Sequence, residues 1–353
     1  MYTCADARRD GVTRCLNCDG TNATAACVSH TGINGNGSNY TWVSDTVHIG
    51  GTALPGFEIA LVDERGPFTG SWGFKPNPAS RDPRDPPWSS LMHSLRAQGV
   101  IAALQYSACF DLDAGTGLVD LGHLLPYKVR DAAVGATASV AGDVTTAEPV
   151  RMVTGSVVGV AIGAEPVNAS AEAHYTMNVD TGTMSTRFPA ALARLMVAAL
   201  ERHCADDPGL VGVCVDAAGR PIALGSPRSI LRGQCYTLTP AQRRAYPDIT
   251  VALAAAGGGP AYALKYTPAM YLWNLGSPCA RSQIGHISGC GNLTGPSCAR
   301  PGAVTAMWAT FHHCMPNSLD EIIVGQDLYN HYLHFHDYEN KTIGLARIVS
   351  CGG

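Results

Sequence analysis

The sequence predicts a mostly β protein with two lobes. Its 353 residues exceed one ordinary core and suit two domains of typical size. The chain contains 39 glycines and 22 prolines, and turn residues separate its short apolar runs, as expected for many strands joined by loops. With 46% hydrophobic and only 15% charged residues, it can bury a large core.

The first half is expected to contain strands, one helix and a hairpin. Residues 1–40, rich in Cys, Asn and Gly, are predicted to be loops, and TWVSDTVHIGG and FEIALVD are predicted to be strands. Apolar residues in WSSLMHSLRAQ recur at helical spacing, so a helix is predicted over 88–98, ended by Gly99. A hairpin is predicted over 103–122, about the turn DAGTG.

The second half is expected to begin near residue 140. Two apolar strands are predicted within 152–167 and another at 175–179. Pro189 suits the first position of a helix, and PAALARLMVAALERH is rich in good helix formers. Later strands are predicted in PDITVALAA, YALKY, AMYLW, EIIVG, YLHFHD and TIGLARI.

Charge and hydropathy argue against two classes of partner. The net charge is −4, and Lys and Arg are scattered rather than gathered in a basic stripe, so no nucleic-acid partner is expected. The longest uncharged apolar stretch, residues 152–164, is interrupted by Gly and too short to cross a bilayer, so no membrane span is expected.

Cysteines and glycosylation acceptors indicate a secreted, luminal or vacuolar protein. The chain has 13 cysteines, and the CxxC of Cys15 and Cys18 has no second pair to complete a zinc site, so a disulfide-rich protein is predicted. Six N-x-S/T sites agree with this location: Asn22, Asn36, Asn39, Asn168, Asn292 and Asn340. The sequence nevertheless starts without a signal peptide and has an odd cysteine count, which suggests that an N-terminal part is missing.

One acidic residue, Asp180, lies between an apolar strand and a helix in YTMNVDTGTMSTRFP. Gly182 permits a close backbone approach that a side chain would block. Nearby amides and Thr hydroxyls can hold the Asp180 carboxylate, while apolar surroundings resist its ionisation. A carboxyl in this setting suits acid and base chemistry.

The residues around Asp180 resemble the second active-site motif of the pepsin-like aspartic proteases. Downstream, EIIVGQDLYNHYLHFHDYENKTIGLARI is similar to the closing segment of that family. Upstream, VSDTVHIGG, GSWGFKP, SLMHSLRAQGVI and YSACFDLDAGTGLVDLG follow the order of its first lobe. The last of these, with its Cys, is most like the nepenthesin-like plant branch. The resemblance runs from about Val28 to Ile348.

This resemblance implies a bilobal β fold whose central cleft holds a peptide or protein substrate. It implies a truncated N-terminal lobe over 1–138 and a C-terminal lobe over 139–353, in a monomer without cofactor or metal. Each lobe of the family supplies one Asp, and the two activate a water that hydrolyses the peptide bond. Asp180 corresponds to the second-lobe catalyst, with Thr181, Gly182 and Thr183 as its supports. A disulfide between Cys235 and Cys279 is also implied.

The chain departs from the family pattern in its first lobe. Between Met1 and the expected flap there is no apolar strand followed by DTG or DSG, so the chain as written is expected to be inactive. The best candidate for the flap over the cleft is NGNGSNY, with Asn34, Gly35, Gly37 and Tyr40. Ile33 or Asn34 replaces the tyrosine expected there, and Tyr40 is the candidate substitute. Met184 stands where a small hydroxyl residue is common.

Other candidate groups are better explained structurally. Asp19 and Asp113 lie in Gly-containing turn sequences and do not supply the missing motif. The histidines of YLHFHD are assigned to a solvated strand face in preference to a metal site. Cys314, beside two histidines, is expected to form a disulfide rather than act as a nucleophile.

Three hypotheses remain open. The first is part of a secreted aspartic endopeptidase that is active in its complete form. The second is a non-catalytic relative whose cleft binds a peptide or an inhibitor, and the altered flap favours it. The third pairs Asp180 with its copy in a dimer, and it is disfavoured because much of a first lobe is present.

Overall fold

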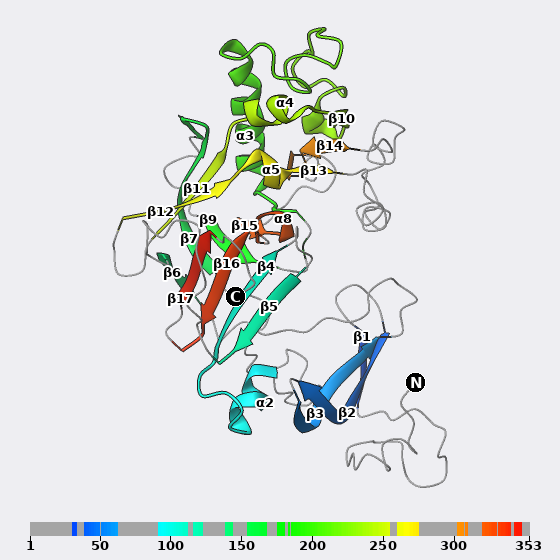
Figure 1. Ribbon diagram of the computed structural model, residues 1–353, viewed down its shortest axis with the longest axis vertical. Coiled ribbons are helices and arrows are strands. Elements are labelled where there is room, and N and C mark those ends of the chain that lie inside the picture. Colours follow the sequence, from blue (N-terminus) through cyan, green and yellow to red (C-terminus); the bar gives the residue numbers. More distant parts are fainter. Residues whose placement is uncertain are drawn as a thin grey trace.

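The computed structural model of the chain consists mainly of strands (Figure 1). It describes residues 30–33, 39–49, 51–62, 91–111, 116–122, 138–143, 154–167, 175–180, 183, 185–254, 260–274, 302–306, 308–309, 320–329, 331–339 and 342–347. The longest helix among them is α3, Ala190–Arg202. This arrangement confirms the mostly β class that the sequence predicts.

The first described strands form an antiparallel sheet in the order β1-β2-β3. They are β1 (His30–Ile33), β2 (Asn39–Ile49) and β3 (Thr52–Val62). β2 and β3 form a hairpin at Gly51, whose φ of 83° is natural for glycine. The prediction of loops throughout residues 1–40 is wrong at β1 and at the start of β2. Pairing with neighbouring strands stabilises these residues, and local composition does not reveal it.

The predicted helix and hairpin follow. α2 (Leu91–Ala97) packs against β3, and Gly99 follows it with a φ of 71°. The buried residues of α2 are Leu91, Met92 and Leu95. β4 (Gln105–Asp111) and β5 (Thr116–Leu121) then pair antiparallel across the predicted turn.

Eleven of the described strands belong to one sheet. Its main path runs β12-β11-β7-β6-β17-β16-β4-β5, while β8 and β9 pair with β7, and β15 pairs with β9. The strands not yet introduced are β6 (Ala138–Asp143), β7 (Thr154–Ile162), β8 (Glu165–Pro166), β9 (Tyr175–Val179), β11 (Ile249–Leu253), β12 (Tyr262–Tyr266), β15 (Glu321–Val324), β16 (Tyr332–Asp337) and β17 (Thr342–Arg347).

The last two strands of the chain lie inside this sheet. β16 pairs with β4, and β17 pairs with β6, so segments from both halves of the sequence share one hydrogen-bonded layer (Figure 1). Gly344 on β17 lies opposite Phe335 on β16, and a Cβ on Gly344 would lie 1.7 Å from the Phe335 ring. The predicted boundary at 138/139 falls at the start of β6, and the division into lobes there stays a prediction.

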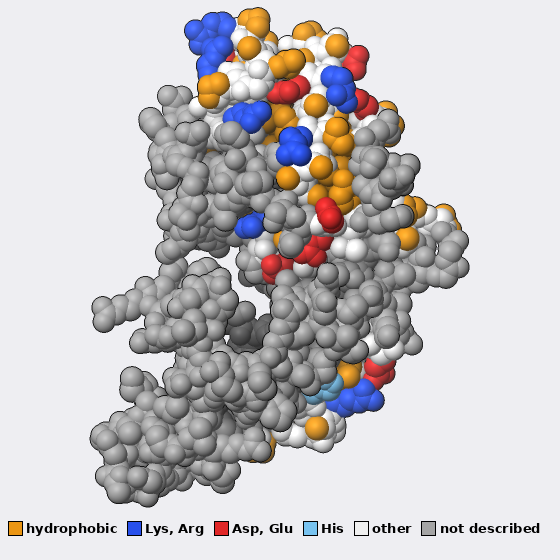
Figure 2. All heavy atoms as spheres, turned by 180° about the vertical axis from the view of Figure 1, so that it is seen from behind, with side chains coloured by type: hydrophobic (Ala, Val, Ile, Leu, Met, Phe, Trp, Pro, Cys, Tyr) orange, Lys and Arg blue, Asp and Glu red, His pale blue; other side chains and the backbone are white. Residues whose placement is uncertain are grey.

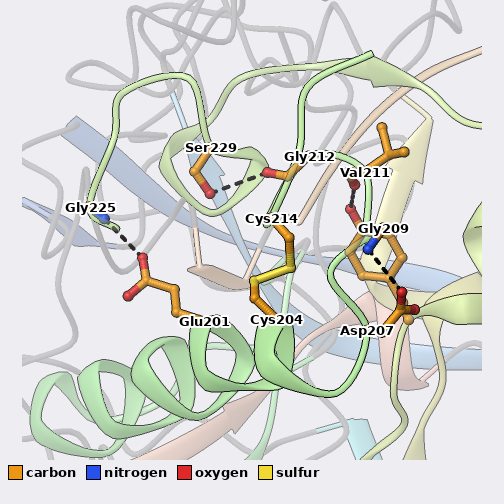
Figure 3. The surroundings of a disulfide bond; sticks show 10 residues. Glu201, Cys204, Asp207, Gly209, Val211, Gly212, Cys214, Gly225 and Ser229 are labelled. Carbon is orange, nitrogen blue, oxygen red and sulfur yellow. Dashed lines mark hydrogen bonds between the residues drawn. A yellow bond between two sulfur atoms is a disulfide. The ribbon is translucent and has the colours of Figure 1, made fainter. Parts of the chain in front are cut away.

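α3 covers part of β7 and leads into a segment that a disulfide ties to its end. Pro189 is its N-cap rather than its first helical residue, a difference of one position. The buried residues of α3 are Leu192, Ala193, Met196, Ala199 and Leu200. After α3, η2 (His203–Ala205) contains Cys204, which is bonded to Cys214 (Figure 3). The amide of Gly225 also donates to Glu201 of α3, at 3.0 Å.

A second three-stranded sheet and several short helices complete the C-terminal half. They are β10 (Tyr236–Thr237), β13 (Leu272–Asn274), β14 (Ala303–Ala306), η3 (Ile230–Arg232), α4 (Pro240–Ala245), α5 (Pro268–Tyr271) and α8 (Gln326–Tyr329). The strand predicted in AMYLW is correct only at its end, because α5 occupies its first three residues. Pro268 at the first position favours that helical turn.

Large aromatic side chains fill much of the described core. Trp308, Tyr266, Tyr271, Tyr332 and Phe188 are among the largest buried side chains. None of the described helices has the length and apolar character that crossing a membrane requires. On one face, described basic side chains are interspersed with acidic ones (Figure 2). Among the described ion pairs, Nη2 of Arg202 lies 2.6 Å from Oε1 of Glu165.

Candidate active site

Asp180 follows β9 directly and is held in place by its own backbone. β9 runs parallel to β15, with Val179 beside Val324, and the strand buries Met177 and Val179. The Asp180 amide donates to the Val324 carbonyl at 3.0 Å. The backbone of Asp180 is therefore fixed at the ends of β9 and β15. The residue is half-buried.

Thr183 connects Asp180 to the turn after β15. Its hydroxyl donates to Oδ2 of Asp180 at 2.6 Å, and its amide donates to the Asp180 carbonyl at 3.1 Å. The Thr183 carbonyl accepts from the Gln326 amide at 2.8 Å. A hydrogen bond to a carboxylate favours its ionised form and fixes its orientation.

The chain beyond Thr183 packs directly on Gly325. A Cβ at Gly325 would lie 2.5 Å from the Ser185 carbonyl carbon and 2.8 Å from the Thr183 oxygen. Backbone bonds in both directions join Arg187 to Ile323, at 2.8 and 2.9 Å. We call residues 183 and 185–187 the Asp180 loop. Its close approach to Gly325 requires a residue without a side chain.

A second carboxyl, Asp327, lies beneath this loop. Thr186 donates to Oδ1 through both its amide and its hydroxyl, each at 2.8 Å. Ser185 donates to Oδ2 at 2.9 Å, and the Tyr266 hydroxyl donates to the same oxygen. Burial raises the pKa of Asp327 to about 6, against the lowering effect of these hydrogen bonds.

Sequence reasoning missed the residues of this network. Ser185, Thr186, Tyr266 and Asp327 are all buried. Each of them has polar neighbours in the sequence, so the local pattern gives no signal that it is buried. Buried polar groups need partners. Which partners they find depends on contacts between distant segments, and the sequence alone does not specify those contacts.

Most of the other predicted site residues lie outside the described residues. These are Thr181, Gly182, Met184, the flap residues Asn34, Gly35 and Gly37, and the acceptors Asn22, Asn36, Asn168, Asn292 and Asn340. Tyr40 lies on β2, where its backbone faces Gly32 on β1 and Val62 on β3. Asn39, also an acceptor site, faces Ile33, so residues 34–38 join two antiparallel strands. Their role as a flap stays a prediction.

The predicted pairing of Cys235 with Cys279 also stays a prediction. Cys235 is in a disulfide, and Cys279 lies outside the described residues. The bond between Cys204 and Cys214 was not predicted. Nothing in the spacing of these two cysteines singles them out among the thirteen.

The solvated strand face predicted for the histidines of β16 is wrong. His334 and His336 are 0% and 2% exposed, so the face of β16 that holds them is covered. His336 stacks on Tyr106 of β4, with ring centroids 4.4 Å apart. Burial lowers the pKa of His336 to about 3. Among the described residues no group of His, Cys, Asp or Glu is arranged to hold a metal ion.

The arrangement of strands matches that of a known class of enzyme. An aspartic proteinase from Irpex lacteus superposes on this chain with a TM-score of 0.59, over 92% of this chain and 82% of that one. The chain has the fold of an aspartic proteinase. The two sequences are 16% identical, and this likeness establishes the fold. The pepsin-like fold predicted from the sequence is thereby confirmed.

Comparisons of sequence alone return no such match. No protein-family model matches the chain, and no curated protein matches it significantly. The likeness to aspartic proteinases is therefore one of fold, at 16% sequence identity. The nepenthesin-like branch suggested by YSACFDLDAGTGLVDLG stays a prediction.

Proposed function

We propose that this chain carries the Asp180 half of an aspartic endopeptidase site. In this proposal a water lies between Asp180 and a second carboxyl, attacks the peptide carbonyl, and is activated by whichever carboxyl is ionised. The protonated carboxyl donates its proton to the carbonyl oxygen. Two carboxyls this close cannot both ionise, so one pair supplies both the base and the acid.

One observation carries the proposal. Asp180 ends a buried strand in the fold of an aspartic proteinase, and Thr183 donates a 2.6 Å hydrogen bond to its carboxyl. The resemblance around YTMNVDTGTMSTRFP assigns the catalytic role to this Asp, and the fold supplies the setting that the role needs. Thr181 and Gly182 complete the proposed support.

The proposed substrate is a peptide or protein held in a cleft between two lobes. The proposed protein is a monomer that acts in the secretory pathway, a vacuole or the extracellular space. All four cysteines among the described residues are disulfide-bonded, which supports an oxidising compartment. No cofactor enters the proposed reaction.

The test of this proposal is cleavage of a peptide library by the protein in its native length. Products are identified by mass spectrometry between pH 3 and 6. Asp180→Asn is expected to reduce cleavage by about 10²- to 10⁴-fold or more, because the amide can act neither as base nor as acid. Asp206→Asn is the matched control, since Asp206 is an exposed carboxyl in the segment after α3.

Full cleavage by the Asp180→Asn variant would refute the assignment. A second candidate function is retained because the 353 residues contain a single DTG sequence and no DSG. In that case the chain binds peptides without cleaving them. Peptide binding that is weakened by Asp180→Asn, with no products at any pH, would favour this non-catalytic role.

A further inference from the structure

The Asp180 loop is attached to the protein through a carboxyl that does not belong to the proposed catalytic pair. Thr183 bonds to Asp180, and the next two described residues, Ser185 and Thr186, both bond to Asp327. Thr186 also accepts a bond from the Gly325 amide at 3.2 Å. The Asp180 loop thus bonds to the carboxyl of Asp180 at its start and to the carboxyl of Asp327 through its next residues.

We propose that Asp327 is a positioning residue for Asp180, clamping the Asp180 loop through Ser185 and Thr186 in a way that depends on a proton. The catalytic importance of this clamp rests on the proposed function. The clamp itself consists of contacts within the folded chain and does not depend on that function. Asp327 is 4% exposed, while Ser185 and Thr186 are 0% and 1% exposed. Water is therefore not a ready substitute for any of these contacts.

The network can hold a proton because three of its members are hydroxyls. All four donors to Asp327 are uncharged: the Thr186 amide and the hydroxyls of Ser185, Thr186 and Tyr266. An ionised carboxyl accepts all four bonds. A protonated carboxyl donates one, and a hydroxyl can rotate to accept it. Burial without a cationic donor favours the protonated form, which agrees with the raised pKa of Asp327.

Other titratable groups around α8 are engaged elsewhere or neutral. α5, β15 and β16 all pack against α8. Tyr271 on α5 donates to the Pro247 carbonyl, and Tyr332 on β16 donates to the Lys265 carbonyl, both at 2.8 Å. Glu321 lies at the far end of β15 from α8.

Two titratable groups of these segments remain: His334 on β16, and Tyr266, which belongs to the network itself. Burial holds the pKa of His334 on β16 well below its ordinary value, so this ring is neutral when Asp327 titrates. Tyr266, whose pKa burial raises well above 10, is neutral as well. Asp327 is therefore the group whose charge changes between pH 4 and 7 in this network.

The clamp is expected to weaken as the pH rises from about 4 to 6. The raised pKa means that the closed loop binds a proton that an opened, hydrated Asp327 would release near its ordinary value of 3.8. Between pH 4 and 7 this difference favours opening by up to roughly 50-fold. The Thr186 amide reports it directly, because its own hydrogen bond is to Asp327.

The experiment is amide hydrogen exchange of the full chain from pH 4 to 7, read at Thr186 and corrected for the intrinsic pH dependence of exchange. Protection is expected to fall by up to about 50-fold, with the midpoint of this fall, on a logarithmic scale, at about pH 5. In Asp327→Asn this fall is expected to disappear, since the amide keeps an acceptor oxygen and cannot titrate. An unchanged fall in Asp327→Asn would overturn the proposal.

A matched pair of tyrosine variants keeps the test independent of that substitution. Tyr266→Phe removes a bond that lowers the pKa of Asp327, so the midpoint is expected to move to higher pH. Tyr271→Phe removes a buried hydroxyl that does not reach Asp327, and the midpoint is expected to stay. Equal midpoints in the two variants would also overturn the proposal.

Exchange requires no substrate, so failure of the clamp and failure of the proposed function are separable. Asp180→Asn is expected to abolish cleavage while the pH dependence at Thr186 persists. If the chain cleaves no peptide, the exchange experiment still decides the role of Asp327. If the chain does cleave peptides, kcat is expected to fall less steeply toward neutral pH in Asp327→Asn than in the parent protein. KM is expected to stay nearly unchanged.

Discussion

At the scale of single residues, the two aspartates that bond to the Asp180 loop differ in their surroundings. Asp180 is half-buried at the end of β9, and Thr183 donates a hydrogen bond to its carboxyl. Asp327 is buried and holds the loop from below. The sequence could predict Asp180, because its neighbours DTGT mark it. It could not predict Asp327, whose partners come from segments more than fifty residues away in the chain.

Gly325 is the residue on which the Asp180 loop rests, and its replacement tests that packing. In Gly325→Ala the new Cβ would meet the Ser185 backbone at 2.5 Å, and backbone cannot rotate away as a side chain can. A loss of about 1–3 kcal/mol in the free energy of unfolding is expected from such overpacking. The measurement is denaturant unfolding at pH 5.

Gly159→Ala is the matched control for this prediction. Its Cβ would meet nothing closer than the Ala252 Cβ at 3.9 Å, so little change in stability is expected. If the two variants unfold at the same denaturant concentration, the close approach at Gly325 does not matter for stability.

At the scale of elements, β16 shows where sequence patterns are insufficient. YLHFHD predicts a strand correctly, and its alternating histidines look like a solvated face. In the structure the face of β16 that holds the histidines is covered, and His334 and His336 are buried. Period-two alternation identifies a strand but does not say what covers each face.

The burial of His336 predicts a loss of stability in acid. The unfolded chain takes up a proton near pH 6.5, while the folded protein resists this down to about pH 3. The free energy of unfolding is therefore expected to fall by roughly 1.4 kcal/mol per pH unit for this group as the pH drops through that window. His336→Phe keeps a ring to stack on Tyr106 and removes the titration.

Denaturant unfolding at pH 6, 5 and 4 measures this effect. The slope of stability against pH is expected to be shallower in His336→Phe than in the parent protein, whatever their difference at pH 7. Equal slopes would mean that His336 is solvated in the folded protein. Asp327 acts with the opposite sign, because its raised pKa makes stability fall as the pH rises from about 4 to 6.

At the scale of the whole molecule, most elements were predictable from the sequence, but the pairing of the last two strands with strands from earlier in the chain was not. Turn residues and apolar alternation located the helices α2 and α3 and most strands, because these depend on local pattern. The placement of β16 and β17 between β4 and β6 depends on pairing across more than two hundred residues. Only the resemblance to a known family, and not the local pattern, anticipated that the two halves belong together.

The central claim is that Asp180 shares one water with a second carboxyl. Its most direct test is kcat/KM for one cleaved peptide, measured from pH 2 to 8 with the protein in its native length. A carboxyl pair that shares a proton titrates in two steps, so the account predicts a bell-shaped profile with its maximum in acid, absent in Asp180→Asn. A profile with a single step that is highest at neutral pH or above would contradict it.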